Sequence, residues 1–273
     1  MNKKYTLKEL TALAKTVRLL TLEISYRART CHVGSALSIS DILSVLYFTR
    51  LNITATNRDS NSRDRFILSK GHAAAALYAA LHKKGIISSR KLFSFGQNNG
   101  LCEHPEIHER GIEMTTGSLG HGLAFGIGIS YGLRLQREKG NVFVLMSDGE
   151  CGEGSVWEAA LLAPRLQLDN LTVIIDYNKW QCFGATNEVT LLEPFVDKWK
   201  TFGWEVVEVD GHDIRKLKSV FDKNPLKKQK PTVVIAHTIS GKGVSCIEDQ
   251  LIGHYKVFTE EEYMVAKKEF ETL

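Results

Sequence analysis

Two polar groups that follow apolar runs have the chemistry to hold a divalent cation and a phosphate. Asp148 and Gly149 follow the apolar run 142–146 after Ser147, and Asn178 follows the predicted strand 171–176. Carboxylate and amide oxygens are ligands that Mg²⁺ accepts readily. A glycine beside the acid lets the backbone approach a diphosphate, and a following helix N-terminus favours negative charge. The alternative is an ordinary turn, because Asp-Gly is a common turn dipeptide.

Histidines stand near the ends of two other predicted strands. His72 follows strand 65–69, and His237 ends strand 232–237. In open parallel α/β sheets, ligands bind outside the carboxyl ends of the strands. If these strands are neighbours, an acid, an amide oxygen and histidines converge on one edge. Histidine suits proton transfer near neutral pH, whereas the alternative for any single histidine is a cap or a satisfied polar group.

The rest of the chain alternates between strand and helix patterns. Strands are predicted at residues 65–69, 141–146, 171–176, 204–209 and 232–237. Helices are predicted at about 6–30, 40–50, 70–85, 155–163, 193–202 and 259–273, and in the second half of 115–140. This alternation predicts an α/β fold with a doubly wound, mainly parallel sheet. No internal repeat or low-complexity linker interrupts it, so residues 1–273 are predicted to form a single domain.

Composition and charge exclude several classes of partner. The chain has 273 residues, 43% hydrophobic and 24% charged, with a net charge of +4. The Lys-rich stretch 222–231 has no interleaved aromatic residues, which indicates a solvated loop rather than a nucleic-acid surface. No apolar run approaches the ~20 residues of a membrane span, and the N-terminus lacks a signal-peptide core. Five scattered cysteines without a Cys-x-x-Cys pair favour the cytoplasm.

Two further patterns suggest other ligands but have the wrong spacing. Cys102, His104 and His108 could indicate zinc, but Pro105 interrupts helical spacing and no fourth ligand follows. The glycines within 117–128 imitate a dinucleotide-binding fingerprint. They do not directly follow a predicted strand, and their spacing differs from that motif. Neither pattern predicts a site.

Four separated stretches, residues 63–85, 104–128, 147–160 and 237–245, resemble transketolases and occur in the same order. The resemblance extends from about residue 15 to 257. It covers the first of the three domains in that family, the one that binds the diphosphate of thiamine diphosphate. Together with residues 170–184 and 197–213, it is most similar to the amino-terminal half of transketolases that are split into two chains. It therefore implies a thiamine diphosphate-binding fold for the whole of 1–273.

The resemblance also implies roles for particular residues. The metal, Mg²⁺ or Ca²⁺ or Mn²⁺ in its place, would be held by the Asp148 carboxylate, the Asn178 amide and the Trp180 main-chain carbonyl. The implied cofactor-binding residues are His72, Gly117, Ser118, Leu119, Gly149, Glu153, Asn178 and His237. Among these, the backbone of 117–119 would pass near the aminopyrimidine ring. Glu153 would lie at a subunit interface, opposite a carboxylate of the partner.

Catalytic roles are implied for His32, His104 and His237, which would face substrate hydroxyls. Some neighbouring residues depart from the family pattern. Cys31 and Val33 flank His32 in place of glycine and proline, and Ser147 replaces the glycine before Asp148. His121 stands where many members have glutamine. These departures remove no metal ligand, but they leave the identity of the acceptor sugar unassigned.

The implied activity is ketol transfer, in which a two-carbon unit passes from a ketose phosphate to an aldose. The activating glutamate and the arginines that hold sugar phosphate belong to the family's second domain, outside this chain. A second subunit carrying the pyrimidine-binding and carboxy-terminal domains is therefore expected, in a heterotetramer. One alternative is a related acyl or ketol transferase with an unusual sugar acceptor, for instance in surface-sugar synthesis. Another is a non-catalytic scaffold subunit.

Overall fold

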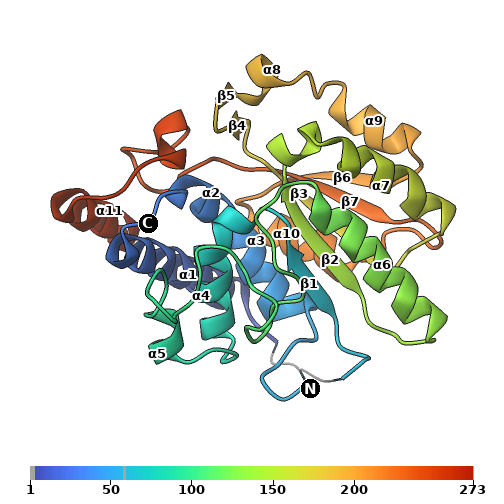
Figure 1. Cartoon of the computed structure of the whole chain (residues 1–273), viewed down its shortest axis with the longest axis horizontal. Helices are drawn as coiled ribbons and strands as arrows, with labels where there is room; N and C mark the ends of the chain where they lie inside the picture. Colours follow the sequence, from blue (N-terminus) through green and yellow to red (C-terminus); the bar gives the residue numbers. More distant parts are fainter. Residues whose placement is uncertain (1–3, 58–59, 273) are drawn as a thin grey trace.

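A five-stranded parallel sheet forms the centre of the molecule (Figure 1), which is a computed structural model describing residues 4–57 and 60–272. The strands lie in the order β1-β2-β3-β7-β6. Their bounds are Arg65–Leu68 (β1), Val142–Ser147 (β2), Leu171–Tyr177 (β3), Glu205–Asp210 (β6) and Thr232–His237 (β7). Each of the five predicted strands is present, and the predicted parallel sheet is confirmed.

Helices cover both faces of the sheet and bury it in two apolar clusters (Figure 1). One face carries α1 (Leu7–Ala28), α3 (Ser40–Val45), α4 (Ala74–Lys83) and α10 (Ile214–Asp222). The other carries α6 (His121–Leu135), α7 (Gly154–Arg165) and α9 (Phe195–Thr201). A third cluster joins α11 (Glu260–Thr272) to α1 and to α2 (Val33–Ser38). Because both faces are covered, β2 is a continuous buried apolar run.

Short elements complete the chain and lie mostly in the connections. They are a π-helical turn at Leu46–Arg50, 3₁₀ helices at Gly71–Ala73, Gly149–Gly152 and Leu251–His254, the short helices α5 (Ser89–Leu92) and α8 (Thr186–Val189), and the antiparallel pair β4 (Trp180–Gln181) and β5 (Gly184–Ala185). Three of these short elements lie in segments that follow β1, β2 and β7, and β4–β5 follows β3. The connections after the strands are therefore structured rather than open loops.

The register of the sheet brings the strand ends together. Ser147 of β2 pairs with Asp176 of β3, and Tyr177 of β3 pairs with His237 of β7. Because all five strands are parallel, the residues that follow β1, β2, β3 and β7 lie at the same edge of the sheet, the one formed by the carboxyl ends of the strands. The expectation that polar groups after these strands converge is therefore met by the topology.

Glycines set the distance between α6 and the sheet. A Cβ on Gly122 would lie 2.2 Å from Ser69 Oγ, and one on Gly126 would lie 2.5 Å from Val144 Cγ2. Any larger residue would push the helix off β1 and β2. Gly122 and Gly126 thus serve close helix–sheet packing, whereas a Cβ on Gly128 would meet no atom within 4 Å.

The structure also adds to the predicted elements. The helix α10 was not predicted, although it supplies the crossover between β6 and β7 that parallel strands require. Residues 223–231 form turns without regular structure, as expected for the Lys-rich stretch. Within 4–57 and 60–272, no helix combines the length and apolarity needed to cross a membrane.

Candidate functional site

Asp148 is a completely buried carboxylate at the end of β2. It accepts hydrogen bonds from the Gly149 N–H (2.9 Å), the Lys179 N–H (2.9 Å) and the Thr186 hydroxyl (2.8 Å). All three donors are neutral. Burial raises the pKa of Asp148 to about 7, while the hydrogen bond from Thr186 opposes that rise. A buried carboxylate held by neutral donors suits a divalent cation, which would supply the missing positive charge.

The loop after β3 brings a second oxygen to this carboxylate. The Lys179 N–H bonds Asp148, so Asn178 and Trp180 lie on the segment that touches it. The Asn178 side chain donates from Nδ2 to Asp176 (2.9 Å), which directs its Oδ1 the other way, toward the Trp180 N–H (2.9 Å). That Oδ1 keeps a second lone pair for a cation. The donor set thus fits a hard cation, although these residues do not include three clustered acidic, histidine or cysteine side chains.

A donor without a partner lies beside Gly149, where a diphosphate is expected. A Cβ on Gly149 would lie 3.0 Å from Cγ of Gln181, so that side chain runs directly over the glycine. The Gln181 Nε2 group is buried and has no hydrogen-bond partner among the described residues. Buried donors rarely remain unsatisfied. An amide donor next to a glycine at a strand end fits a phosphate oxygen, so the residues present fit thiamine diphosphate with its metal.

Glu150 anchors the loop that was predicted to pass near the aminopyrimidine. Its buried carboxylate accepts hydrogen bonds from the Ser69 hydroxyl and the Gly120 N–H (2.8 Å). Burial raises the pKa of Glu150. The loop Gly117–Leu119 is thereby tied to the ends of β1 and β2. Next to it, the hydroxyl of Thr116 is buried with no partner in the described part of the chain, a second orphaned polar group at this edge.

A buried ion pair lies beneath the site. The Lys70 ammonium and the Asp176 carboxylate are both fully buried and bonded to one another. Asp176 also accepts hydrogen bonds from Ser38 (2.7 Å), Asn178 and Thr238. These residues come from α2 and from the segments after β1, β3 and β7. Asp176 therefore ties together the strand ends that carry the site.

Replacing Lys70 with alanine is expected to lower the free energy of unfolding by about 3–5 kcal/mol, because Asp176 would be left as an uncompensated buried charge. Urea denaturation followed by circular dichroism measures the change. Lys200→Ala is the matched control, since Lys200 and Asp197 form an exposed pair at 3.7 Å. Its cost should stay within ~1 kcal/mol. Equal losses in the two variants would contradict the central role of Lys70.

Three histidines form a cluster next to this ion pair. The ring centroids of His32, His72 and His254 lie 5.3–5.6 Å from one another. The Nε2 atom of His72 lies 2.9 Å from the Ser35 hydroxyl. The N–H of His32 donates to the carbonyl of His254 (3.0 Å), which holds α2 against the 251–254 turn. The backbone of His32 is left-handed (φ 65°), an uncommon conformation for a residue other than glycine.

Gly34 permits this contact between α2 and the 251–254 turn. A Cβ at Gly34 would lie 2.9 Å from the carbonyl oxygen of Gly253 and 2.7 Å from the Ser240 hydroxyl oxygen. The carbonyl of Gly34 itself accepts the N–H of Gly241 (2.9 Å). Gly34 therefore has a structural reason, since it lets the 251–254 turn, which carries His254, approach His32.

His104 completes the cluster from the loop after α5. A Cβ on Gly117 would lie 3.2 Å from the His104 ring, so this histidine packs against the 117–119 loop. Burial is the largest cause that lowers the pKa of His32 and of His72, and the electrostatic effect of His104 adds to both, although other neighbouring charges contribute more at His72. The structure does not support zinc binding by Cys102, His104 and His108, because the Nε2 atom of His108 instead lies 3.2 Å from a carboxylate oxygen of Glu106. Among residues 4–57 and 60–272, no group of three or more His, Cys, Asp or Glu side chains is arranged to hold a metal.

Burial and neighbouring charge lower the pKa values of His32, His72 and His254. Desolvation is the main cause that lowers the pKa of His32, and it lowers that of His72 well below the usual value. The pKa of His254 falls to about 4, chiefly by burial and then by repulsion from His32 and Lys70. Neutral imidazoles at pH 7 can both accept and donate a proton.

His237 is not part of this cluster. Its side chain is 43% exposed, its Nε2 lies 2.8 Å from Glu208, and its ring packs against Tyr177. Tyr177 also packs on Phe195 of α9, on the α6–α7–α9 side of the sheet. The structure thus brings together His32, His72 and His104 of the predicted histidines, with His254 as an added member, and leaves His237 apart.

Sequence reasoning missed His254, Lys70, Asp176 and Glu150. Two of these carried a usable signal, because Lys70 directly precedes the Gly-His pair after β1 and Glu150 lies within the acidic stretch after β2. His254 stands in an irregular segment seventeen residues beyond β7, with no periodic pattern around it. Only the folded loop places it at the site.

Glu153 lies where a subunit contact was expected. It is exposed, at the N-cap position of α7, and its side chain has no hydrogen bond to the described part of the chain. A Cβ on Gly120 would lie 2.7 Å from Glu153 Cβ, so this acid lies beside the end of the 117–119 loop. His121, at the first turn of α6, is also exposed.

A doubly wound parallel sheet with a buried acid, an amide and a histidine cluster at the carboxyl ends of its strands is the arrangement expected of a thiamine diphosphate-binding α/β domain. The comparisons with known proteins agree with this class. Residues 10–272 match the family described as "Transketolase, thiamine diphosphate binding domain". The chain belongs to the transketolase family and is its thiamine diphosphate-binding part, which confirms the predicted fold and family.

Two similar proteins are named as transketolase subunits and are of about this length. One, from Phocaeicola vulgatus, belongs to an apulose-4-phosphate transketolase and is 40% identical over 249 residues, which cover 91% of this chain and 89% of that protein. Another, from Clostridium sp., belongs to a 6-deoxy-6-sulfo-D-fructose transketolase and is 38% identical over 260 residues, 94% of each. The crystal structure of transketolase from Campylobacter jejuni matches with a TM-score of 0.92 and 30% identity. The match covers 98% of this chain but 43% of that one.

Proposed function

We propose that this chain is the amino-terminal subunit of a two-chain, thiamine diphosphate-dependent transketolase. The observation that carries the proposal is the histidine cluster, which lies at the same edge of the sheet as the buried carboxylate of Asp148. It joins a site for a metal-bound diphosphate to groups that can move protons on a sugar. The reaction is the transfer of a two-carbon ketol unit from a ketose phosphate to an aldose. Retention of these groups argues against a scaffold without activity.

This chain would hold the diphosphate of the cofactor and its metal. Asp148, Asn178 and the Trp180 carbonyl are the proposed ligands of Mg²⁺, and Gly149 and Gln181 would contact the diphosphate. When bound, thiamine diphosphate supplies the carbon that takes up the ketol unit. The loop Gly117–Leu119, anchored by Glu150, would position its ring end. Holding the cofactor rigidly in this way favours reaction by orientation.

The histidines would accept protons from the sugar hydroxyls and return them. His32, His104 and His254 are proposed to face substrate, and His72, bonded to Ser35, to face the diphosphate. Breaking and forming the sugar carbon–carbon bond requires a hydroxyl to lose a proton and a carbonyl oxygen to gain one. Because their pKa values are lowered, His32 and His254 are unprotonated at neutral pH, so a ring nitrogen of each can accept a hydrogen bond from a sugar hydroxyl.

The substrates are proposed to be ketose and aldose phosphates or related modified sugars. One relative is named for apulose 4-phosphate and another for 6-deoxy-6-sulfo-D-fructose. Both names describe ketoses other than the common pentose phosphates, which supports the alternative of an unusual sugar. Cys31 Sγ lies 3.1 Å from His32 Nδ1, at a position where the family pattern has glycine, so this chain's side of the proposed substrate site differs from the common one. Five free cysteines suit a reducing cytoplasm as its location.

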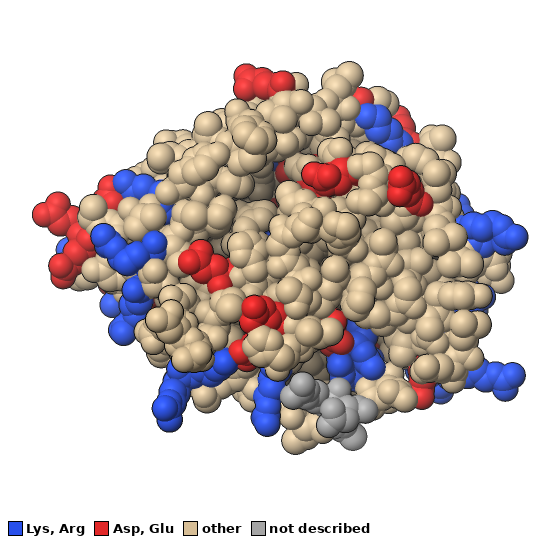
Figure 2. Space-filling view, viewed as in Figure 1, with Lys and Arg blue, Asp and Glu red and all other residues tan. Residues whose placement is uncertain are grey.

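An exposed apolar face supports a partner subunit. Along α6 the exposed side is uncharged from Ala124 to Tyr131 and ends at Leu135, and α7 exposes Leu161 and Leu162. Figure 2 shows few charges over α6 and α7, with lysines and arginines mostly at the periphery. Exposed apolar patches of this kind mark interaction sites. We propose that this face is covered by the second subunit and by a second copy of the pair in a heterotetramer.

Reconstitution tests the proposed function. The purified chain, the proposed second subunit, and their mixture are assayed with thiamine diphosphate and Mg²⁺. The panel contains xylulose 5-phosphate, apulose 4-phosphate and 6-deoxy-6-sulfofructose as donors, with aldose phosphates as acceptors. Ketol transfer should occur only in the mixture. Full turnover by this chain alone, with no co-purifying chain by mass spectrometry, would overturn the two-chain proposal.

Leu161→Glu on α7 is expected to weaken binding of the second subunit, raising its Kd about tenfold or more, because a charge would be buried in an apolar interface. Analytical ultracentrifugation measures the assembly. Val265→Glu on α11 is the matched control, because the two side chains are 58% and 57% exposed. In Figure 1, α11 lies at the opposite side of the molecule from α7. If both variants assembled like the wild type, the α6–α7 face would not be the interface.

A further inference from the structure

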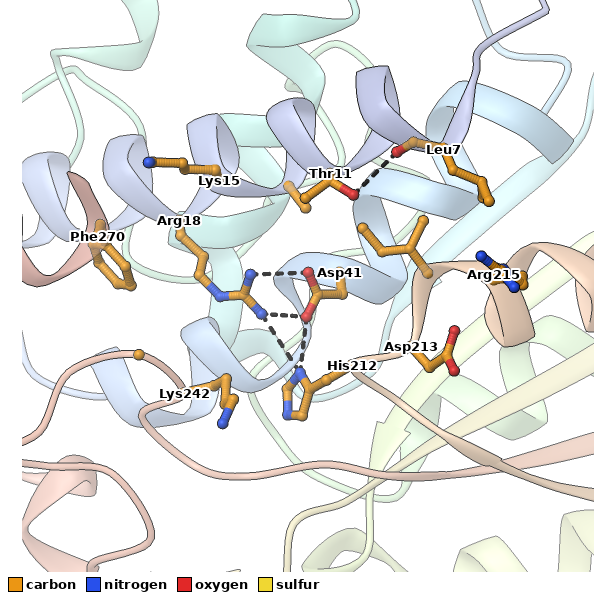
Figure 3. Close-up of a pocket in the computed structure, with 13 residues that line it drawn as sticks. Leu7, Thr11, Lys15, Arg18, Asp41, His212, Asp213, Arg215, Lys242 and Phe270 are labelled. Atoms are coloured by element: carbon orange, nitrogen blue, oxygen red, sulfur yellow. Dashed lines mark hydrogen bonds and ion pairs between the residues drawn. The ribbon is translucent and has the colours of Figure 1, made fainter. Parts of the chain in front are cut away.

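A large cavity lies outside the candidate site, between α1, α10 and α11 (Figure 3). Its volume is about 530 Å³, within the range of small-molecule sites, which is roughly 300–1,000 Å³. One face of α1 forms a wall, and the opposite wall is the first turn of α10 together with the 242–243 segment. None of its lining residues belongs to the candidate site described above.

The wall of the cavity is apolar and its rim is basic. Leu7, Ala14, Ile214 and Phe270 supply apolar surface. Lys15, Arg18, Arg215 and Lys242 are the cations, against Asp41 and Asp213 as the acids. An apolar body with an anionic group would match both parts of such a surface.

Two of these cations have no acid to balance them within the described ranges. Asp41 neutralises Arg18, Glu248 pairs with Lys242 (3.0 Å), and Asp213 caps α10. Lys15 donates to the main-chain carbonyl of Glu271 (3.0 Å). Over residues 4–57 and 60–272, neither Lys15 nor Arg215 forms an ion pair with an acid. The cavity therefore carries an excess of positive charge.

Arg18 also lines this cavity and has a donor to spare. Its two terminal nitrogens face Asp41, but its Nε–H is buried and finds no hydrogen-bond partner in the part of the chain that the structure describes. Asp41 is fixed in turn by His212, whose Nε2 accepts the N–H of Ile239 (2.9 Å) and whose Nδ1 then donates to Asp41 (2.8 Å). The guanidinium is thus rigidly held, as Figure 3 shows. A buried unsatisfied donor is rare and points to an acceptor that the chain itself does not supply.

We propose that this cavity binds a small organic anion, a carboxylate, sulfonate or phosphate ester with an apolar body. The anionic group lies at the Lys15 end of the cavity, where an acceptor oxygen takes the Arg18 Nε–H, and Arg215 lies at the opposite end (Figure 3). The apolar body rests on Leu7 and Ile214. The site is a second ligand site of this chain, independent of the ketol-transfer proposal.

A segment of the second subunit is the competing occupant. The unpartnered apolar face that such a partner would cover lies on α6 and α7, whereas the cavity lies against α1 and α10. The cavity is also a local pocket with two unbalanced cations rather than a long groove. These features favour a small ligand.

Anilinonaphthalene sulfonate is the probe, because it joins a sulfonate to apolar rings. Fluorescence and calorimetric titration of the reconstituted complex should show one saturable site per chain. The double variant Lys15→Glu, Arg215→Glu should raise its Kd about tenfold or more, since charge-assisted contacts are lost. Thr11→Trp, an exposed position that lines the cavity, should do the same by filling it. Circular dichroism and thermal melting confirm that each variant is folded.

The double variant Lys227→Glu, Lys228→Glu is the matched control, because it makes the same change of charge at exposed residues outside the cavity. It should leave the Kd unchanged. Three results would overturn the proposal: wild-type affinity in both cavity variants, equal binding of the same ring system without its sulfonate, and stoichiometric release of the probe when the second subunit is added to the chain. The last would assign the cavity to the partner.

Discussion

Replacing Asp148 with asparagine is expected to weaken thiamine diphosphate binding at least a hundredfold, an effect of about 2.7 kcal/mol or more. The carboxylate is completely buried and held by neutral donors, so a divalent cation is the charge that would balance it. Asparagine keeps the shape but removes the anionic ligand. Calorimetric titration of the reconstituted complex at saturating Mg²⁺ measures the cofactor Kd.

Asp64→Asn is the matched control for this experiment. Asp64 is also buried, but it precedes β1 at the amino end of the sheet, where it binds Asn52 and Asn141 and lies 3.6 Å from Arg50. Its replacement should lower stability and leave the cofactor Kd within about twofold. A near-normal Kd in the Asp148 variant would refute the assignment of the metal site.

Replacing His254 with alanine is expected to lower kcat by about 10²–10⁴-fold, the usual contribution of a general acid or base. The ring lies 5.5 Å from that of His32 and 5.6 Å from that of His72, at the edge where Asp148 and Asn178 emerge. The main-chain carbonyl that anchors His32 remains in the variant. Steady-state kinetics of the complex should show the loss in kcat, with the thiamine diphosphate Kd nearly unchanged.

His237→Ala separates this interpretation from the prediction made from sequence. Its ring faces Glu208 and Tyr177, away from the cluster, so kcat should stay within about threefold of the wild type. His32→Ala and His104→Ala should resemble His254→Ala. If His237→Ala lost turnover and His254→Ala did not, the sequence-based role of His237 would be restored and the cluster would lose its proposed function.

The sheet could be predicted because each of its strands has a recognisable pattern within a short stretch of sequence. Strands buried on both faces are largely apolar, as 142–146 and 171–175 are, and intervening helices force them to be parallel. The helix α10 escaped prediction although Ile214, Leu217 and Phe221 have helical spacing and Asp213 caps it. Its many charged residues run directly into the Lys-rich stretch, which hides the boundary.

The site could be predicted only where topology fixes it. Residues directly after a strand must lie at the sheet edge, so Asp148 and Asn178 could be located from sequence. His254 depends on a long loop whose path is set by distant contacts, such as Gly241 N–H to the Gly34 carbonyl and Asp249 N–H to the Ser240 carbonyl. No local pattern encodes such contacts. The same limit explains the choice of His237, which directly ends a strand but points elsewhere.

The strand order also governs when the site can exist during protein synthesis. A nascent chain emerges amino-terminus first, so β6 leaves the ribosome before β7, the strand that must lie between it and β3. Until residue 237 has emerged, β6 has no neighbour and β3 keeps an open edge. Such non-local pairing is slow, and open edges invite aggregation. Cofactor-binding competence therefore has to wait until β7 has left the ribosome, and chains that terminate before β7 will depend on chaperones.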